Sequence, residues 1–311
     1  MNVIVTGGAG FIGSHVVDAL VEQGHRVTVV DDLSTGIRGN VHSGATLEQV
    51  DVRDSGALND VTRRAHPYIV IALAASVDVN ESVNDPMLDA STNVMGSLNT
   101  FLAGVRNGAR HLIFSSTGGA LYGESPDPAT EETPVQPLSP YAVSKYAAEL
   151  YLGWVCRQYG VAGTILRYAN VYGPRQNGSA GAGVVGAFAR ALLHGRRPII
   201  YGDGLQTRDF VYVDDVVRAN LLALKAPPGT YNIGTGVKTS ILELARLCCL
   251  TYERDADIEM RPGRSGEIRD SVLDAGRAVR LLGWQPRWRL CDGLGLTLEW
   301  YREMAEGENR A

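Results

Sequence analysis

Tyr141 and Lys145 are two residues whose types and spacing could do acid–base chemistry. They are four positions apart, so on a helix their side chains share one face. A free phenol, with a pKa of about 10, is almost wholly protonated at neutral pH, and an adjacent ammonium favours the phenolate. Ser139 is a predicted N-cap and Pro140 a predicted first helical residue, which puts Tyr141 at the positive end of the helix. The pair could serve as a base with its activating cation, although such pairs also occur by chance in amphipathic helices.

A glycine-rich turn near the N-terminus predicts a nucleotide site. A short β-branched run at residues 3–5 enters Thr-Gly-Gly-Ala-Gly-Phe-Ile-Gly at residues 6–13, after which apolar residues continue at helical spacing. Glycines there allow a tight turn and let backbone N–H groups approach a pyrophosphate. A second predicted strand ends in Asp31, whose carboxylate can accept hydrogen bonds from an adenosine ribose and would repel a 2′-phosphate. The pattern favours NAD over NADP.

Further strands alternate with helices and end in small or polar residues. Residues 46–50 precede Asp51 and Val52, residues 68–73 precede Ala74 and Ala75, and residues 112–114 lead to Ser115 and Thr117. Such alternation implies a parallel sheet with right-handed crossovers that binds ligands beyond the carboxyl ends of its strands. Asp51 and Val52 are therefore candidates for the adenine edge, with a plain strand-end role for Asp51 equally open.

The predicted fold is α/β, a Rossmann-type doubly wound parallel sheet with a smaller α/β C-terminal substrate domain. We place the NAD-binding Rossmann domain at residues 1–168 and a mainly substrate-binding domain at residues 169–311, with an approximate boundary across which segments can return to the first domain. No repeat or low-complexity linker separates the two, so direct packing is expected.

Composition narrows the function classes. The 311 residues are 45% hydrophobic with a net charge of -5, which argues against a nucleic-acid or membrane-surface partner. No apolar run approaches the roughly 20 residues that span a bilayer, and the N-terminus lacks a signal pattern, so a cytoplasmic protein is expected. Cys156, Cys248, Cys249 and Cys291 form no CxxC pair or His cluster, which favours reduced thiols and no metal site.

The sequence resembles the extended short-chain dehydrogenases/reductases, and specifically the UDP-glucose 4-epimerase branch of nucleotide-sugar epimerases. The similarity spans nearly the whole chain and rests on six stretches, residues 6–15, 31–36, 115–117, 141–145, 170–175 and 201–216. It implies that Tyr141 is the catalytic base, that Lys145 holds the nicotinamide ribose and lowers the Tyr141 pKa, and that Thr117 hydrogen-bonds the reacting hydroxyl. Many relatives have Ser where this chain has Thr117, and the hydroxyl is retained.

The resemblance also implies the binding residues. Together with the strand-end positions above, the cofactor set is Gly7, Gly10, Phe11, Ile12, Gly13, Asp31, Asp32, Leu33, Ser34, Thr35, Gly36, Asp51, Val52, Leu73, Ala74, Ala75, Asn93, Ser115, Tyr141, Lys145 and Tyr168. The substrate set is Thr117, Tyr141, Asn170, Val184, Val185, Tyr201, Arg208, Arg264 and Glu267.

The implied reaction is NAD-dependent 4-epimerisation of a UDP-hexose through a transient 4-keto sugar. Related dehydratases often place acids after the hydroxyl that Thr117 supplies, whereas this chain has Gly118, Gly119 and Ala120. Two alternatives stay open. One is a 4-epimerase of UDP-glucuronate, whose carboxylate could be held by Asn177 and Ser179 in the loop at residues 176–183. The other is a non-catalytic NAD-binding sensor, against which the intact catalytic residues speak.

Two finer expectations follow from the resemblance. Ser271 falls where epimerases restricted to smaller hexoses often carry a bulky aromatic residue, so room for an N-acetyl group is expected. The helices predicted at residues 92–106 and 141–159 resemble those that pair as a four-helix interface in relatives, so a homodimer is expected. Leu150 and Trp154 are candidates for that interface, with core packing equally open.

Overall fold

The computed structural model describes residues 1–125, 127–176, 183–263 and 268–308. Among them lies a sheet of seven parallel strands in the order β10-β6-β5-β4-β1-β2-β3. Its strands are β1 (Asn2–Thr6), β2 (Arg26–Asp31), β3 (Thr46–Gln49), β4 (Ile69–Ala72), β5 (His111–Thr117), β6 (Ala162–Tyr168) and β10 (Gly229–Ile233). The chain builds outward from β1 to β3, then reverses and builds from β4 to β10. The predicted doubly wound fold is confirmed, and its strand order reverses between β1 and β4.

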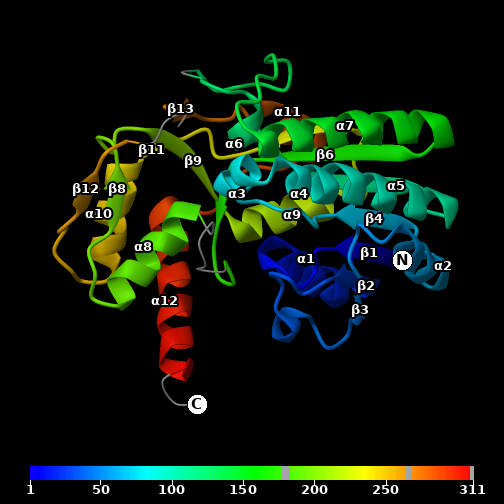
Figure 1. The fold of residues 1–311 in the computed structure, drawn as a ribbon, viewed down its shortest axis with the longest axis horizontal. Coiled ribbons are helices and arrows are strands. Elements are labelled where there is room, and N and C mark those ends of the chain that lie inside the picture. The colour runs from blue at the N-terminus through cyan, green and yellow to red at the C-terminus, as the bar shows by residue number, and fades with distance from the viewer. Residues whose placement is uncertain (126, 177–182, 264–267, 309–311) are drawn as a thin grey trace.

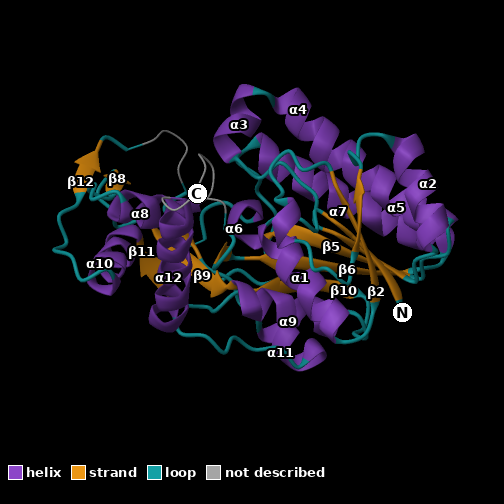
Figure 2. Cartoon of the chain, turned by 90° about the horizontal axis from the view of Figure 1, so that it is seen from below, coloured by secondary structure: helices purple, strands orange, loops and turns teal. Residues whose placement is uncertain are grey.

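Helices cover both faces of the sheet (Figure 2). On one face lie α1 (Phe11–Glu22), α9 (Val213–Ala223) and α11 (Gly276–Leu282); on the other lie α2 (Ser55–Ala65), α5 (Ser97–Arg106) and α7 (Pro140–Tyr159). Successive strand residues point to opposite faces, and both faces are covered, so the strands are continuously apolar. Val3 and Val5 of β1 pack in one hydrophobic cluster, whereas Ile4 packs in the other.

A second, smaller lobe lies beside the carboxyl ends of the strands (Figure 1). Its helices are α8 (Gly183–Leu193), α10 (Ile241–Thr251) and α12 (Leu290–Glu308), and its strands are β7 (Asn170–Tyr172), β8 (Ile199–Tyr201), β9 (Thr207–Tyr212), β11 (Lys238–Ser240), β12 (Glu259–Arg261) and β13 (Asp270–Ser271). Strand β9 ends at Tyr212, and Val213 already begins α9. Helices α9 and α12 were not expected from the sequence.

The helix that carries Tyr141, α7, begins as predicted. The Ser139 hydroxyl accepts a hydrogen bond from the Ala142 amide at 3.2 Å, and Pro140 is the first helical residue. Gly160, at a φ of 65°, ends the helix in the left-handed conformation that glycine tolerates.

The helix expected at residues 92–106 begins instead as a π-helix, η2 (Ser91–Gly96), that continues into α5. The short helices are η1 (Arg38–Asn40), α3 (Val79–Asn84), α4 (Pro86–Ala90) and α6 (Gly118–Leu121).

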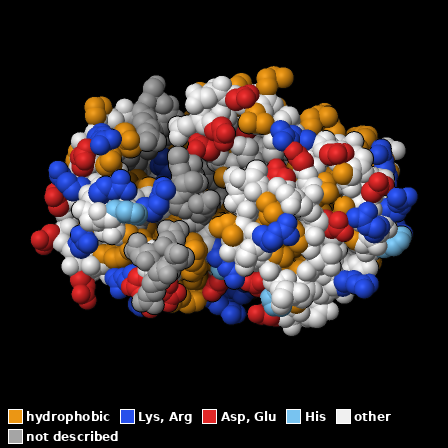
Figure 3. Space-filling view, turned by 60° about the horizontal axis from the view of Figure 1, so that its bottom comes forward, with side chains coloured by type: hydrophobic (Ala, Val, Ile, Leu, Met, Phe, Trp, Pro, Cys, Tyr) orange, Lys and Arg blue, Asp and Glu red, His pale blue; other side chains and the backbone are white. Residues whose placement is uncertain are grey.

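The surface carries both signs of charge. Figure 3 shows Lys and Arg side chains interspersed with Asp and Glu side chains over the face that it draws. Within the described ranges, the helices are each too short or too polar to cross a membrane. The four cysteines are free thiols.

Candidate active site

The glycine turn between β1 and α1 is shaped by close backbone contacts. Gly7 has a φ of 70°, and a Cβ on it would lie 2.7 Å from the Ala74 nitrogen. A Cβ on Gly13 would lie 2.0 Å from the Gly7 carbonyl oxygen. On Gly10, by contrast, a Cβ would meet only that same oxygen, at 3.2 Å. The turn is therefore tightly packed at Gly7 and Gly13, whereas space remains next to Gly10.

The start of α1 fits an anionic ligand. Gly10 caps the helix without a side-chain hydrogen bond, and the first turn carries no acidic residue. Helix N-termini offer backbone N–H groups and a positive dipole end, so a pyrophosphate could bind there without competition from a capping side chain. Phe11 and Ile12 open this helix and are partly buried against the core.

Asp31 lies at the end of β2 and faces the glycine turn. Its carboxylate accepts hydrogen bonds from the Ala9 and Leu33 amides, each at 2.9 Å. Burial raises the pKa of Asp31, and these two hydrogen bonds oppose the rise. A carboxylate has about four acceptor positions, so capacity remains for ribose hydroxyls. A Cβ on Gly36 would lie 2.6 Å from an Asp31 oxygen, which explains why a glycine follows the turn there.

The residues after Asp31 form a tight turn. The Asp32 carboxylate accepts from the Ser34 amide at 2.9 Å and from its hydroxyl at 2.6 Å, and Leu33 has a φ of 63°. Thr35 lies between Ser34 and Gly36 in this same turn. Residues 32–36 therefore form a turn directly after Asp31, whose carboxylate faces the glycine turn.

The residues that follow β3 and those that follow β4, both predicted to contact the cofactor, lie in different surroundings. Asp51 is held in an exposed ion pair with Arg53, which lowers the Asp51 pKa, and Val52 is buried against Gly96. At the end of β4 the Leu73 amide donates to the Thr6 carbonyl at 3.1 Å, and the Ala74 amide donates to the Thr6 hydroxyl at 3.3 Å. These contacts bring residues 73–75 to the glycine turn, at the point where the strand order reverses.

Asn93 is buried in η2, and its side-chain amide forms hydrogen bonds with three neighbouring segments. It donates to the Ser76 carbonyl at 2.9 Å, and its oxygen accepts from the Ser76 amide at 2.9 Å. It also donates to Asp89 at 2.8 Å and to the Ser144 hydroxyl of α7 at 3.2 Å. Asn93 therefore ties the loop after β4 to the helix that carries Tyr141.

Thr117, Tyr141 and Lys145 meet at the end of β5. The Thr117 hydroxyl hydrogen-bonds the Tyr141 phenol. Lys145 is buried, one turn further along α7, with its Nζ 4.3 Å from the centre of the Phe114 ring on β5. The structure thus brings the three predicted catalytic side chains to one edge of the sheet, beside the loop that Asn93 holds.

The expected direction of the Tyr141 pKa is wrong for the chain alone. Burial raises the pKa of Tyr141 to about 12, and the hydrogen bond from Thr117 opposes this rise. Burial also lowers the pKa of Lys145 to about 8, against the carboxylates of Glu149 and Asp89. For Tyr141 the carboxylate of Asp89 acts in the same direction as burial, and for Lys145 burial outweighs the two carboxylates.

Ser115 and Tyr168 form a buried contact between β5 and β6. The Tyr168 hydroxyl hydrogen-bonds Ser115 and accepts from Asn220 at 2.8 Å, and burial raises the Tyr168 pKa. Tyr168 thereby holds the end of β5 in place.

Beyond Thr117, the side of the site where the sequence predicts the substrate is bounded by α6, β7 and β13. A Cβ on Gly119 would lie 3.2 Å from the Asn170 side-chain oxygen. The Ser271 hydroxyl donates to the Gly119 carbonyl at 3.3 Å, and Ser271 is buried. Asn170 and Ser271 therefore both lie next to the turn that follows Thr117.

The remaining substrate candidates lie in the smaller lobe. Ser271 pairs in register with Arg208 of β9, whose guanidinium donates to the Thr207 carbonyl at 2.8 Å. Val185 is buried in the core, so only its backbone could face a ligand, whereas Val184 is partly exposed. Tyr201 ends β8, and its carbonyl accepts from Gln206 at 2.9 Å. Arg264 and Glu267, like Asn177 and Ser179, lie outside the described residues.

Two buried acids at the site were missed from the sequence. Glu149 accepts hydrogen bonds from Ser116 and Arg167. Asp209 accepts from the Thr235 and Gly236 amides at 2.8 Å and 3.0 Å and so holds the loop between β10 and β11. Glu149 could have been found, since it is four residues beyond Lys145 on the same helix face. Asp209 gave no such signal, because its partners are distant in sequence.

Comparison with known proteins places the chain among nucleotide-sugar enzymes. Residues 3–234 match the NAD dependent epimerase/dehydratase family. The chain is 41% identical over 315 residues to the UDP-glucose 4-epimerase of Mycolicibacterium smegmatis, covering 98% of this chain and 100% of that protein.

Two solved structures share the fold over nearly their whole length. One is the UDP-glucose 4-epimerase of Thermotoga maritima with UDP-glucose, with a TM-score of 0.96 and 44% identity over 98% of this chain and 100% of that one. The other is the Thermus thermophilus UDP-glucose 4-epimerase in complex with NAD, with a TM-score of 0.93 and 41% identity over 97% and 99%.

Proposed function

The chain belongs to the NAD dependent epimerase/dehydratase family, and we propose that it is a UDP-hexose 4-epimerase that interconverts UDP-glucose and UDP-galactose. The observation that carries this proposal is the contact between Thr117 and Tyr141, with Lys145 one turn away at the same sheet edge. The relatives named UDP-glucose 4-epimerase support the substrate class. The glycines at positions 118 and 119 support epimerisation, since no acid follows Thr117 there.

We assign the following roles to the chain's own residues. Tyr141 accepts the proton of the sugar 4-hydroxyl and later returns it, while Thr117 holds that hydroxyl by a hydrogen bond. Lys145 binds a ribose hydroxyl of the cofactor and lends positive charge to the phenolate as it forms. Asn170 and Arg208 lie on the sugar side and are the described candidates for holding the substrate.

The cofactor set at the carboxyl edge of the sheet would hold NAD. The open side of Gly10 and the uncapped start of α1 suit a pyrophosphate, and Asp31 suits an unphosphorylated ribose. When bound, NAD supplies a reversible hydride acceptor, which lets the sugar pass through a 4-keto state without net oxidation. The chain contributes binding, orientation and proton transfer.

Product analysis tests the proposal. The purified protein is incubated separately with UDP-glucose, UDP-galactose, their N-acetyl counterparts and UDP-glucuronate, and products are identified by NMR. We expect conversion of UDP-glucose and UDP-galactose into each other. Tyr141→Phe should lower kcat by about 10² to 10⁴ while the protein retains NAD. Tyr151→Phe, on an exposed face of the same helix, is the matched control. Near-normal turnover by Tyr141→Phe would remove Tyr141 from its role.

We also propose that the protein is a homodimer through the outer face of α7. Val143, Leu150 and Trp154 lie along this helix and are exposed, as is Met95 on the neighbouring η2. A large apolar stripe on adjacent helices is typical of a twofold interface. The four free thiols fit a reducing, cytoplasmic setting, which we propose as its location.

A further inference from the structure

One buried ion pair holds the chain on both sides of Thr117. Arg167 of β6 and Glu149 of α7 are joined by two hydrogen bonds of 2.6 Å and 3.0 Å, with side chains 7% and 4% exposed. The Ser116 hydroxyl donates to Glu149 at 2.6 Å. Arg167 also donates to the Tyr122 hydroxyl at 2.8 Å. Ser116 directly precedes Thr117, and Tyr122 follows the short helix α6 that Thr117 begins.

The same pair lies on the helix that carries the acid–base residues. Glu149 is one turn beyond Lys145 and two turns beyond Tyr141 on α7. Through the hydrogen bond from Ser116 of β5, Glu149 therefore joins the strand that carries Thr117 to the helix that carries Tyr141. Since a shift of about 1 Å in a reacting group can cost about 10²-fold in rate, these contacts bear on catalysis.

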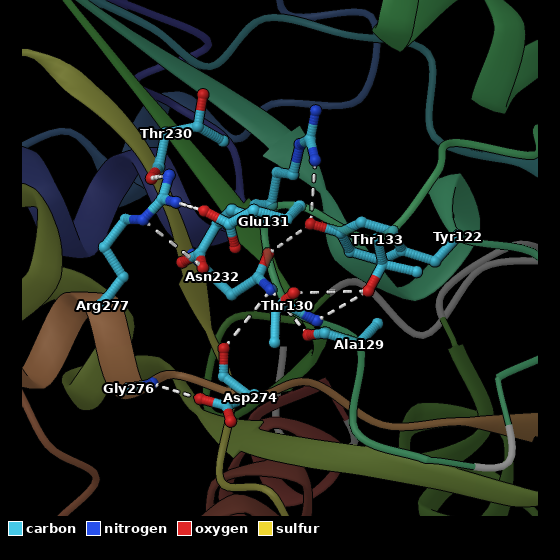
Figure 4. A network of polar contacts seen from close by, with 12 residues as sticks. Tyr122, Ala129, Thr130, Glu131, Thr133, Thr230, Asn232, Asp274, Gly276 and Arg277 are labelled. Carbon is cyan, nitrogen blue, oxygen red and sulfur yellow. Dashed lines mark hydrogen bonds and ion pairs between the residues drawn. The ribbon is translucent and has the colours of Figure 1, made fainter.

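The contacts continue toward the sugar side of the site. Figure 4 shows the Tyr122 hydroxyl directed at Asn232, to which it donates at 2.8 Å. Asn232 in turn donates to the Ala129 carbonyl at 2.8 Å and to the Asp274 carbonyl at 3.3 Å. Asp274 lies three residues beyond Ser271. A continuous set of buried hydrogen bonds thus runs from α7 to the segment that borders the substrate.

The Glu149 carboxylate also acts on the pKa of Lys145, which lies one turn earlier on α7. The ionisable groups near the Lys145 ammonium are Glu149 and Tyr141 on α7 and Asp89 on α4, with Arg167 of β6 behind Glu149; the Phe114 ring of β5 lies against it. Of these, Glu149 opposes the burial of the lysine most strongly. Removal of its charge would leave Asp89 as the other carboxylate that does so.

We propose that Glu149 and Arg167 are positioning residues of the reaction, which fix Thr117 against Tyr141 through Ser116 and Tyr122, with the Glu149 carboxylate one turn from Lys145 on the same helix. This inference rests on the proposed function for its kinetic part, because it assigns these residues to the same reaction. Neither residue touches the reacting atoms. They act through Ser116, Tyr122 and Lys145.

The first test changes the position of Thr117 without breaking the ion pair. Tyr122→Phe removes one hydroxyl from the network. Tyr231→Phe makes the same change in another buried tyrosine, whose hydroxyl donates to the Pro227 carbonyl outside the network. We expect kcat for UDP-glucose to fall about tenfold in Tyr122→Phe with KM changed less than about twofold, since the defect is one of alignment. Tyr231→Phe should behave as the unmodified protein. Equal kcat values for the two variants would overturn the positioning of Thr117.

The second test reads the charge of Lys145 and needs no substrate. The chain has three lysines, Lys145, Lys225 and Lys238, so selective isotope labelling gives a simple NMR spectrum in which each side chain can be titrated. We expect Glu149→Gln to lower the pKa of Lys145 by about one unit or more in the NAD-loaded protein. Glu48→Gln, which removes a carboxylate on β3 that pairs with Arg64 of α2, should leave the Lys145 pKa unchanged. A Lys145 titration that is the same in Glu149→Gln and in the unmodified protein would overturn the role of the pair.

The two tests separate this inference from the proposed function. If the unmodified protein converts no UDP-hexose, the proposed function fails, and the lysine titration still decides the role of Glu149. If the protein is active and both comparisons show no difference, the inference fails while the function stands. Tyr122→Phe and Ser116→Ala keep the ion pair intact, so the kinetic test remains decisive if Glu149→Gln does not fold.

Discussion

Replacement of Gly13 by alanine offers a direct test of the glycine turn. A Cβ at this position would lie 2.0 Å from the Gly7 carbonyl oxygen and 2.9 Å from the Gly8 Cα. The first contact is with backbone, which cannot rotate away as a side chain could. To restore a normal contact, the Gly7 carbonyl must withdraw by about 1 Å, since well-packed interiors tolerate little overlap. That movement displaces the turn where we place the pyrophosphate.

The expected effects on stability and on binding differ in size. Alanine is favoured over glycine inside a helix by about 1 kcal/mol, and overpacking costs about 1 to 3 kcal/mol, so the net loss in unfolding free energy should stay below about 2 kcal/mol. Binding should suffer more, because loss of one hydrogen bond to a charged group costs about 1.5 to 3 kcal/mol. At about 1.4 kcal/mol for each factor of ten, the Kd for NAD should rise about 10- to 150-fold.

Calorimetry on cofactor-free protein measures the Kd, and chemical denaturation measures the stability. Gly295→Ala in α12 is the matched control, since a Cβ there meets no atom within 4 Å. It should gain up to about 1 kcal/mol of stability and bind NAD normally. The reasoning is refuted if Gly13→Ala binds NAD within about threefold of the unmodified protein.

Three further predictions follow from the site and the surface. The phenol of Tyr141 should titrate near pH 12 in the cofactor-free chain and at lower pH once NAD is bound. The measurement is the phenolate absorbance that Tyr141→Phe removes. A pKa below 10, the ordinary value for a phenol, in the absence of NAD would contradict the effect of burial. Ser271→Tyr should reduce turnover of UDP-N-acetylglucosamine at least about tenfold more than that of UDP-galactose, because the larger side chain would project beside Gly119; equal losses on both substrates would count against a gating role. Trp154→Glu should convert a dimer to a monomer in light scattering, and an unchanged mass would remove this face of α7 from the proposed interface.

The sequence was sufficient for the parts of the site that depend on short-range pattern. The strand, glycine turn and helix at residues 2–22, and the cap of the Tyr141 helix, follow from local propensity and from the needs of a tight turn. The convergence of Asp31, Thr117 and Tyr141 followed from topology, since parallel strands deliver their carboxyl ends to one edge. To predict these features, it is enough to know the local sequence and the right-handedness of the crossovers between parallel strands.

Other features depend on contacts between distant residues. Asp209 binds Thr235, Gly236 and Leu273, and Tyr122 binds Asn232, over a hundred residues away. After β9 the chain leaves the smaller lobe: α9 covers one face of the first sheet and β10 adds the strand at its edge, a path that local pattern does not specify. The Tyr141 pKa was misjudged for a related reason: desolvation depends on everything packed around a group, whereas the sequence showed only its helical neighbour.

That misjudged direction has a chemical consequence. Burial raises the pKa of the Tyr141 phenol, so the phenolate that could accept a proton is scarce at neutral pH, while the same burial lowers the pKa of the adjacent lysine. The protein alone therefore keeps Tyr141 protonated, and a lower phenol pKa has to come from positive charge that arrives with the ligands. In that case the fraction of phenolate is linked to occupancy, and Tyr141 becomes able to accept a proton when the cofactor is in place.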